Sequence, residues 1–251
     1  EFGVGIARME DRYFQTNIID FSETKHDEST YSIFGGSIVL EGSTLNARQF
    51  ATQGSREKMA AQIFTGTEHF RSGASKVTKD TPEPYKKVQS WLQVSYQNET
   101  YHKVSPKFTL GAYLEAYYSS RNFSNNYTAT LMQAGEFTPT AHSKVTYNEA
   151  FRANQYAGVG AMPIYQLSES FQLRGEFYGF IPIFPIKKDE YGQAYYGKAF
   201  TKFEYLGEIS LVFQLSFGSI SAYVNHYSSP SNDWNVGLTL GWQLVNSRFI
   251  E

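Results

Sequence analysis

The chain has 251 residues, of which 41% are hydrophobic and 17% aromatic, with a formal net charge of −2 and no cysteine. Its mean hydropathy is −0.42, and no window approaches the about 18 consecutive apolar residues that a membrane-spanning helix needs. The charge lacks the basic excess of nucleic-acid-binding proteins, and the missing cysteines exclude disulfides and thiolate metal sites. Nucleic acid is therefore not an expected partner.

Alternation of apolar and polar side chains is the dominant pattern, and it is clearest between Phe203 and Leu215. Every odd position there is apolar or Gly, whereas the even positions include Glu204 and Glu208. A period of two is typical of a β-strand with one apolar and one polar face. The run exceeds the about 5–6 residues of a strand in a soluble protein and suits the about 9–11 residues of a membrane-spanning strand.

In chain order, the alternation predicts eleven strands joined by short and long links. The expected strands are 1–8, 12–21, 31–40, 59–70, 88–97, 108–118, 151–167, 171–181, 200–216, 219–227 and 234–245. The Glu10–Asp11 turn and the link 168–170 are short, whereas the loops 22–30, 71–87 and 182–199 are long. Bacterial outer-membrane barrels have short turns at one end and long loops at the other. The prediction is an all-β fold, a transmembrane antiparallel β-barrel of about 11–12 strands over residues 1–251.

The stretch Ser119–Ala150 alternates weakly and is expected to be one long extracellular loop that folds inward. The strand count is then odd, whereas single-chain bacterial barrels have an even number of strands. Either residues 126–138 hide a twelfth strand, or strands that precede Glu1 are missing. The lack of a signal peptide favours missing N-terminal residues.

The run from Phe151 to Tyr156 (FRANQY) resembles the inward-folded loop motif of the outer-membrane assembly and two-partner-secretion barrels. In that superfamily the motif is an Arg followed by Gly and an aromatic residue, and Ala153 replaces the Gly here. The resemblance implies the C-terminal part of a sixteen-stranded barrel, in which five strands follow Arg152. Strands one to five of such a barrel would lie outside this chain.

Four segments together resemble the C-terminal barrel of Bacteroidetes patatin-like phospholipases, namely 46–55, 137–144, 151–156 and 241–251. The resemblance implies a surface-antigen-like barrel in the bacterial outer membrane, with a periplasmic C-terminus, that anchors a patatin-like lipid acyl hydrolase. Its implied partners are outer-membrane lipid, an upstream hydrolase domain and a small periplasmic module of the same protein. The barrel-insertion machinery, which reads a terminal aromatic residue such as Phe249, is a further implied partner.

The chain itself carries no catalytic motif. It lacks the Gly-x-Ser-x-Gly elbow of patatin hydrolases and the common metal, phosphate and dinucleotide motifs, so no catalytic residue, metal or cofactor is expected. Whether the full-length protein is an enzyme is left open. Two other functions compete with the anchor: a protein insertion or secretion barrel of the same superfamily, and a passive porin or structural barrel. A homo-oligomer or an envelope complex is also left open.

Charged residues on the expected strands fall on the polar face, which predicts that they line the lumen. They are Glu115, Arg174, Glu176, Glu204 and Glu208. A charge that faces lipid at the bilayer midplane costs roughly 2–4 kcal/mol, less for acids, which explains the side they take. Arg152 on the inward loop is expected to pair with Glu176, and the alternative is that all these groups are ordinary charges in a hydrated lumen. The five histidines are expected on solvated loops and rims.

The apolar face has two interpretations, a lipid-facing surface or the core of a soluble β-sandwich. Its residues are Leu92, Leu110, Leu114, Ile209, Leu211, Phe213, Leu238, Leu240 and Trp242. Strand length, the abundance of Tyr and Phe, and the alternation of long and short links favour the lipid-facing surface.

Overall fold

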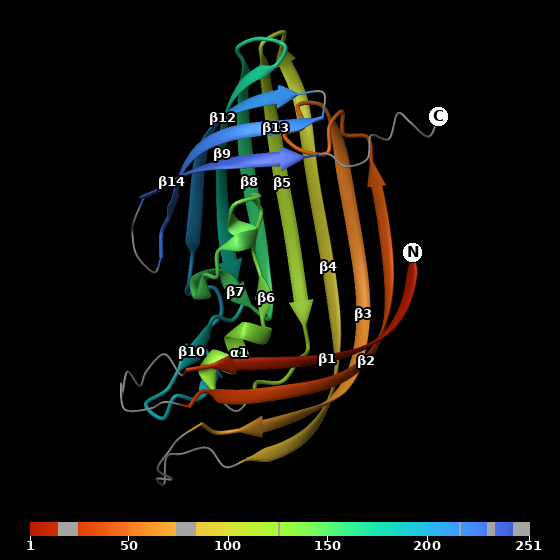
Figure 1. Ribbon diagram of the computed structural model, residues 1–251, viewed down its shortest axis with the longest axis vertical. Coiled ribbons are helices and arrows are strands. Elements are labelled where there is room, and N and C mark those ends of the chain that lie inside the picture. The colour runs from red at the N-terminus through yellow and green to blue at the C-terminus, as the bar shows by residue number, and fades with distance from the viewer. Residues whose placement is uncertain (15–24, 74–83, 125, 216, 230–233, 243–251) are drawn as a thin grey trace.

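Ten strands form one antiparallel sheet, which is the main feature of the molecule (Figure 1). The structure is a computed structural model that describes residues 1–14, 25–73, 84–124, 126–215, 217–229 and 234–242. In spatial order the strands are β1 (Phe2–Tyr13), β2 (Asp27–Ser43), β3 (Gly54–Arg71), β4 (Tyr85–Ser105), β5 (Phe108–Ser119), β8 (Gln155–Gln166), β9 (Phe171–Pro182), β12 (Glu204–Leu215), β13 (Gly218–Tyr227) and β14 (Trp234–Trp242). Each pairs with the next long strand along the chain, so the predicted all-β, antiparallel fold is confirmed.

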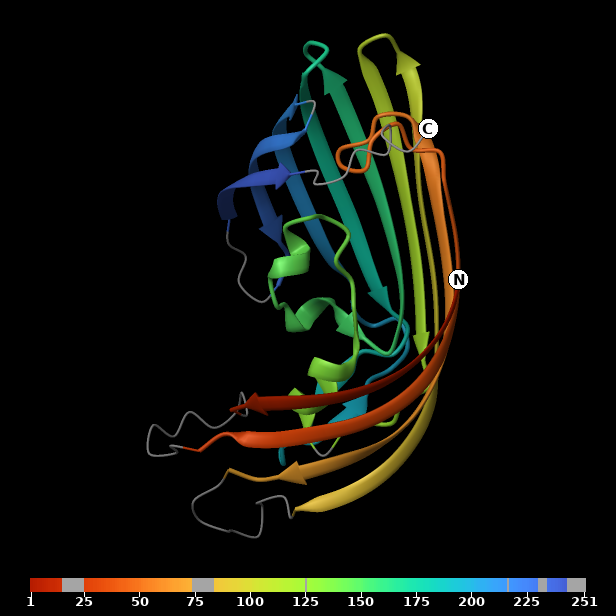
Figure 2. The ribbon, with the colours of Figure 1, turned by 45° about the vertical axis from the view of Figure 1, so that its right-hand side comes forward.

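The sheet bends strongly (Figure 2), and the side chains on its two faces differ in exposure. On β12, Leu206 and Val212 are buried on the concave side, whereas Ile209 is 53% exposed on the convex side. This follows from the period of two, which sends successive side chains to opposite faces. The predicted alternation is therefore confirmed on β12, and β5 shows the same pattern, whereas β1 is exposed along nearly its whole length.

The apolar face of the sheet is the exposed one. The seven leucine and isoleucine residues expected on this face are exposed, and Phe213 is half-buried. The side chain of Trp242 lies outside the described residues. The two further sheets of the described chain have two short strands each, so neither forms the second layer of a sandwich. The soluble-sandwich interpretation is wrong for this structure.

The expected turn at Glu10–Asp11 is wrong, because both residues lie inside β1. Glu10 is opposite Thr30 and Asp11 is opposite Ser29, so β2 supplies backbone partners that carry the strand past the charged pair. The first two expected strands are one strand as far as they are described, and residues 15–21 lie outside the described chain. The large sheet consequently has ten strands instead of the expected eleven.

The inner segment, which is the chain between β5 and β8, lies in the hollow of the sheet (Figure 2). Residues 126–138 are not a twelfth strand of the large sheet: they form the helix α1 (Tyr127–Gln133) and the two-residue strand β6 (Gly135–Glu136). Asn126 starts α1, since its side chain accepts a 2.8 Å hydrogen bond from the backbone N–H of Ala129. Strand β6 pairs with β7 (Arg152–Ala153), so the residues between them form a loop whose two ends are hydrogen-bonded to each other.

The large sheet has two edges in the described part of the chain. There β1 pairs with β2 alone and β14 with β13 alone. The link between β9 and β12 carries a small hairpin of β10 (Ile186–Lys188) and β11 (Ala194–Tyr196). Among the described residues, no helix is long and apolar enough to cross a membrane.

Candidate functional site in the concave interior

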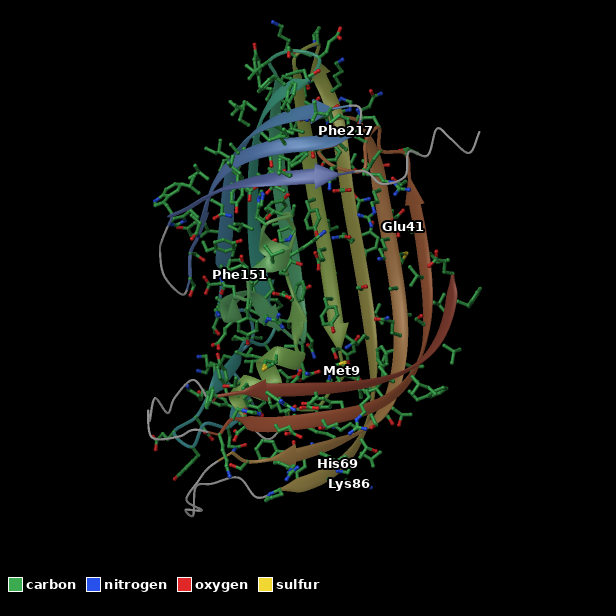
Figure 3. The ribbon with its side chains drawn as sticks, in the orientation of Figure 1. Met9, Glu41, His69, Lys86, Phe151 and Phe217 are labelled. Carbon is green, nitrogen blue, oxygen red and sulfur yellow. The ribbon has the colours of Figure 1, made fainter. Side chains whose placement is uncertain are left out.

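Aromatic side chains of the inner segment pack against the concave face of β8 and β9. The Phe137 ring stacks on Phe180 at a centroid distance of 5.6 Å. The ring of Phe151, which is labelled in Figure 3, lies 5.7 Å from Phe180. All three residues are buried. Gly158 provides the room, because a Cβ there would lie 2.1 Å from the Phe137 ring. The inner segment is therefore tightly packed against the wall.

Arg152 contacts its own segment instead of Glu176. Its guanidinium lies 2.7 Å from the carboxylate of Glu136 and also donates hydrogen bonds to the carbonyl oxygens of Leu131 and Met132, near the end of α1. The pairing of β6 with β7 places Glu136 directly opposite Arg152, and a helix C-terminus attracts a cation. The expected Arg152–Glu176 pair is therefore not formed, because a nearer acid and the helix end already hold the guanidinium.

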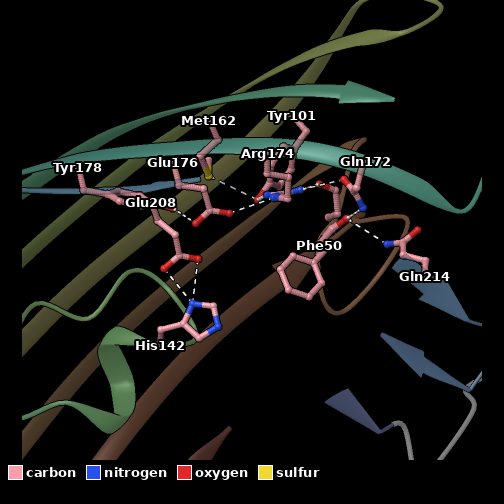
Figure 4. A network of polar contacts seen from close by, with 11 residues as sticks. Phe50, Tyr101, His142, Met162, Gln172, Arg174, Glu176, Tyr178, Glu208 and Gln214 are labelled. Atoms are coloured by element: carbon pink, nitrogen blue, oxygen red, sulfur yellow. Dashed lines mark hydrogen bonds and ion pairs between the residues drawn. The ribbon is translucent and has the colours of Figure 1, made fainter. Parts of the chain in front are cut away.

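Glu176 pairs with Arg174, two residues before it on β9. Arg174 Nε lies 3.0 Å from Glu176 Oε1, and both side chains are almost fully buried on the concave face. The Tyr178 hydroxyl donates to the other carboxylate oxygen at 3.1 Å (Figure 4). Arg174 also donates to the Tyr101 hydroxyl on β4 at 3.2 Å. These additional hydrogen bonds satisfy the polar atoms of both side chains. A buried ion pair needs them, because otherwise the cost of desolvation outweighs the attraction between the charges.

The connection between β2 and β3, residues 44–53, reaches the same cluster from one end of the sheet. Arg174 Nη1 donates to the carbonyl oxygen of Ala51 at 2.8 Å. The carbonyl oxygen of Phe50 accepts hydrogen bonds from Gln172 and Gln214, and Phe50 has a φ of 53°, which is rare for a bulky residue (Figure 4). In the sequence, this connection is marked only by its resemblance to patatin-associated barrels. Its partners are more than 120 residues away, so no local pattern reveals the contact.

His142 links the inner segment to the last strands of the sheet. Its Nδ1 lies 2.8 Å from both carboxylate oxygens of Glu208 on β12, and its Nε2 lies 2.6 Å from Thr239 Oγ1 on β14. Its ring stacks on Tyr223 of β13 with a centroid distance of 3.4 Å. His142 and Glu208 are buried. The expectation of a solvated histidine is thus wrong at this position.

The remaining expected lumen charges also lie on the concave face. Glu115 accepts hydrogen bonds from the hydroxyls of Tyr113 and Tyr156, and Glu204 lies 3.5 Å from Lys202 Nζ. The inner segment adds Arg121, whose guanidinium lies over the rings of Tyr31 and Trp91. Burial lowers the pKa of Arg121 below its ordinary value. The structure therefore places all five expected side chains on one face and divides them among separate clusters.

The buried polar contacts of Arg152, Arg174 and His142 connect segments of the fold to one another and do not resemble a reaction centre. Among the described residues no group of three or more His, Cys, Asp or Glu side chains could hold a metal ion. Comparisons with protein-family models, with curated proteins and with solved structures found no match for this chain. The resemblance to patatin-associated barrels therefore stays a prediction from sequence.

Proposed function

We propose that this chain is the wall of an outer-membrane β-barrel that serves as a membrane anchor and not as an open pore. The single observation that carries the proposal is the contrast between the two faces of the sheet. The convex face exposes aliphatic and aromatic side chains. The concave face carries the charged side chains of Arg174 and Glu208 beside buried rings, and it is covered by the 44–53 connection and by the segment between β5 and β8. A membrane barrel needs an apolar exterior and tolerates a polar, plugged interior.

The two sheet edges support a barrel that is closed by further strands. Unpaired backbone groups in lipid cost several kcal/mol each, so β1 and β14 need neighbours in a bilayer. Five strands follow Arg152 in the large sheet, as the superfamily resemblance implies, and five precede it. A sixteen-stranded barrel would then place six strands, not five, outside this chain. Its C-terminus would be periplasmic, on the side of the short turns.

The anchored partner, on the family resemblance, is a patatin-like lipid acyl hydrolase domain of the same protein. Peptide sequencing of the native protein tests this part, because a Gly-x-Ser-x-Gly peptide upstream supports the anchor. Tandem periplasmic repeats would instead support an insertion or secretion barrel, and a bare signal peptide would support a porin. The covered concave face disfavours the porin.

Membrane insertion is tested by the physical behaviour of the native protein. We expect it to require detergent for extraction from membranes and to migrate differently on SDS gels before and after boiling, because a closed barrel resists SDS. A protein that is monodisperse in detergent-free buffer would contradict the proposal.

A further inference from the structure

A groove of about 590 Å³ lies on the outward face of the sheet across β8, β9, β12 and β13. Gly179 and Gly207 leave room along it, and the rings of Phe177 and Phe203 border it. A Cβ at Gly207 would meet only the Phe177 ring, at 3.6 Å, so a side chain there would extend into the groove. The groove is almost entirely apolar and lies on the face opposite the interior clusters.

Rings with polar atoms stand along one side of the groove. Tyr205 and His226 stack at 5.9 Å, and His226 lies 4.8 Å from Trp234, so the three rings cross β12, β13 and β14 in a row. Amphipathic rings of this kind are enriched where membrane hydrocarbon meets the headgroups. The row therefore indicates that this part of the groove lies near the membrane surface.

The connection between β9 and β12, residues 183–203, leads directly into the groove at Phe203. It exposes Tyr191 and Phe200 to 72% and 69%, and Phe200 has a φ of 55°, which is strained for a bulky residue. The backbone N–H of Phe200 donates to the carbonyl of Ile183 at 2.9 Å and helps to fix that conformation. The connection therefore presents an aromatic ring to its surroundings instead of burying it.

The same connection carries an excess of positive charge. Its four lysines are Lys187, Lys188, Lys198 and Lys202, against the two acids Asp189 and Glu190. The Lys187 side chain packs beside Gly197, where a Cβ would lie 2.9 Å from Lys187 Cε. Lys187 and Lys198 are thereby brought to the same part of the connection, and both residues are exposed.

We propose that the groove and this connection form one binding site for a phosphate-bearing membrane lipid. The acyl chain occupies the apolar groove, and the phosphate contacts Lys187 and Lys198. Lys198 and Phe203 are five positions apart in the sequence, so their backbones lie at most about 18 Å apart. That reach is comparable to one leaflet, half of the about 30 Å hydrocarbon core, so one lipid can contact both features. The inference rests on the proposed membrane insertion.

The test uses the native protein, purified in detergent, and native mass spectrometry with defined lipids. The probes are phosphatidylglycerol and a diacylglycerol with the same acyl chains. Gly207→Leu fills the groove, and Ala116→Leu on the outward face of β5 is its matched control. We expect Gly207→Leu to weaken phosphatidylglycerol binding about tenfold, the lower end of the discrimination that one methylene group makes in an apolar pocket. Ala116→Leu should bind as the wild type does.

The headgroup contact is tested by the double variant Lys187→Gln/Lys198→Gln. It should reduce phosphatidylglycerol binding to the level of diacylglycerol and leave diacylglycerol binding unchanged. Equal binding by Gly207→Leu and Ala116→Leu, or a second protein copy in place of lipid at the groove, would overturn the site while membrane insertion stands. A wild-type protein that does not enter bilayers would overturn the proposed function, and the lipid site with it.

Discussion

The buried Arg174 donates hydrogen bonds to Glu176, Ala51 and Tyr101, and its removal should be costly. Arg174→Met takes away the ion pair of Glu176 and the donor to the β2–β3 connection while it keeps an apolar side chain of similar length. A buried charge left without its partner costs about 3–5 kcal/mol. We expect a loss of that size in the free energy of unfolding, measured by urea denaturation of the protein in lipid or detergent.

The matched control is Arg56→Met. Arg56 forms a 2.8 Å ion pair with Glu41, and the two side chains are 35% and 40% exposed. Exposed pairs contribute about 0–1 kcal/mol because water and salt screen them. Losses of equal size for the two variants would contradict the account of the interior.

Arg152 supplies a second residue-scale prediction, through double-mutant cycles. Arg152→Ala and Glu136→Ala should be non-additive by about 0.5–3 kcal/mol, because the two side chains are in contact. Arg152→Ala and Glu176→Ala should add within about 0.5 kcal/mol, because each residue has another ion-pair partner. Unfolding measurements on the three single variants, the two double variants and the wild type check both cycles. Coupling in the second cycle would restore the pair expected from the sequence.

At the scale of elements, two segments cover the concave face, and together they predict a barrier to ions. The segment between β5 and β8 is fixed by His142 and the Phe137 ring, and the 44–53 connection by Arg174. We expect the native protein to show no steady conductance in planar bilayers. Replacement of residues 124–148 by a short Gly/Ser link should open a pore, as in barrels with an aqueous lumen.

As a control, residues 189–193 at the tip of the β10–β11 hairpin are replaced by Gly and Ser. This tip lies outside the two segments that cover the concave face. That variant should stay closed. Where the larger replacement prevents folding, His142→Ala serves as a milder change, and we expect it to cause brief openings. A native protein that conducts as steadily as the replacement variant would contradict the plugged interior.

At the scale of the whole molecule, the sequence predicted the sheet well and its interior poorly. The period of two is a local signal, and the structure confirms it on strands from β2 to β14. The Glu10–Asp11 turn was wrong because pairing with β2 overrides a charged dipeptide. Glu208, a partner of His142, lies 66 residues away, and Ala51, a partner of Arg174, lies 123 residues away, so only the folded sheet brings them together. The short-range Arg152–Glu136 contact was hidden because β6 has only two residues.

The central claim is that the convex face contacts lipid, and a one-residue step along β4 tests it most directly. The chain has no cysteine, so Val94→Cys on the outward face and Ser95→Cys on the inward face each add one labelling site to these 251 residues, and the unsubstituted protein is the labelling control. With a small fluorophore attached in reconstituted bilayers, a quencher carried on the lipid chains should quench the label at position 94 strongly. The label at position 95 should be nearly unaffected. Equal quenching at both positions, or stronger quenching at 95, would contradict the claim.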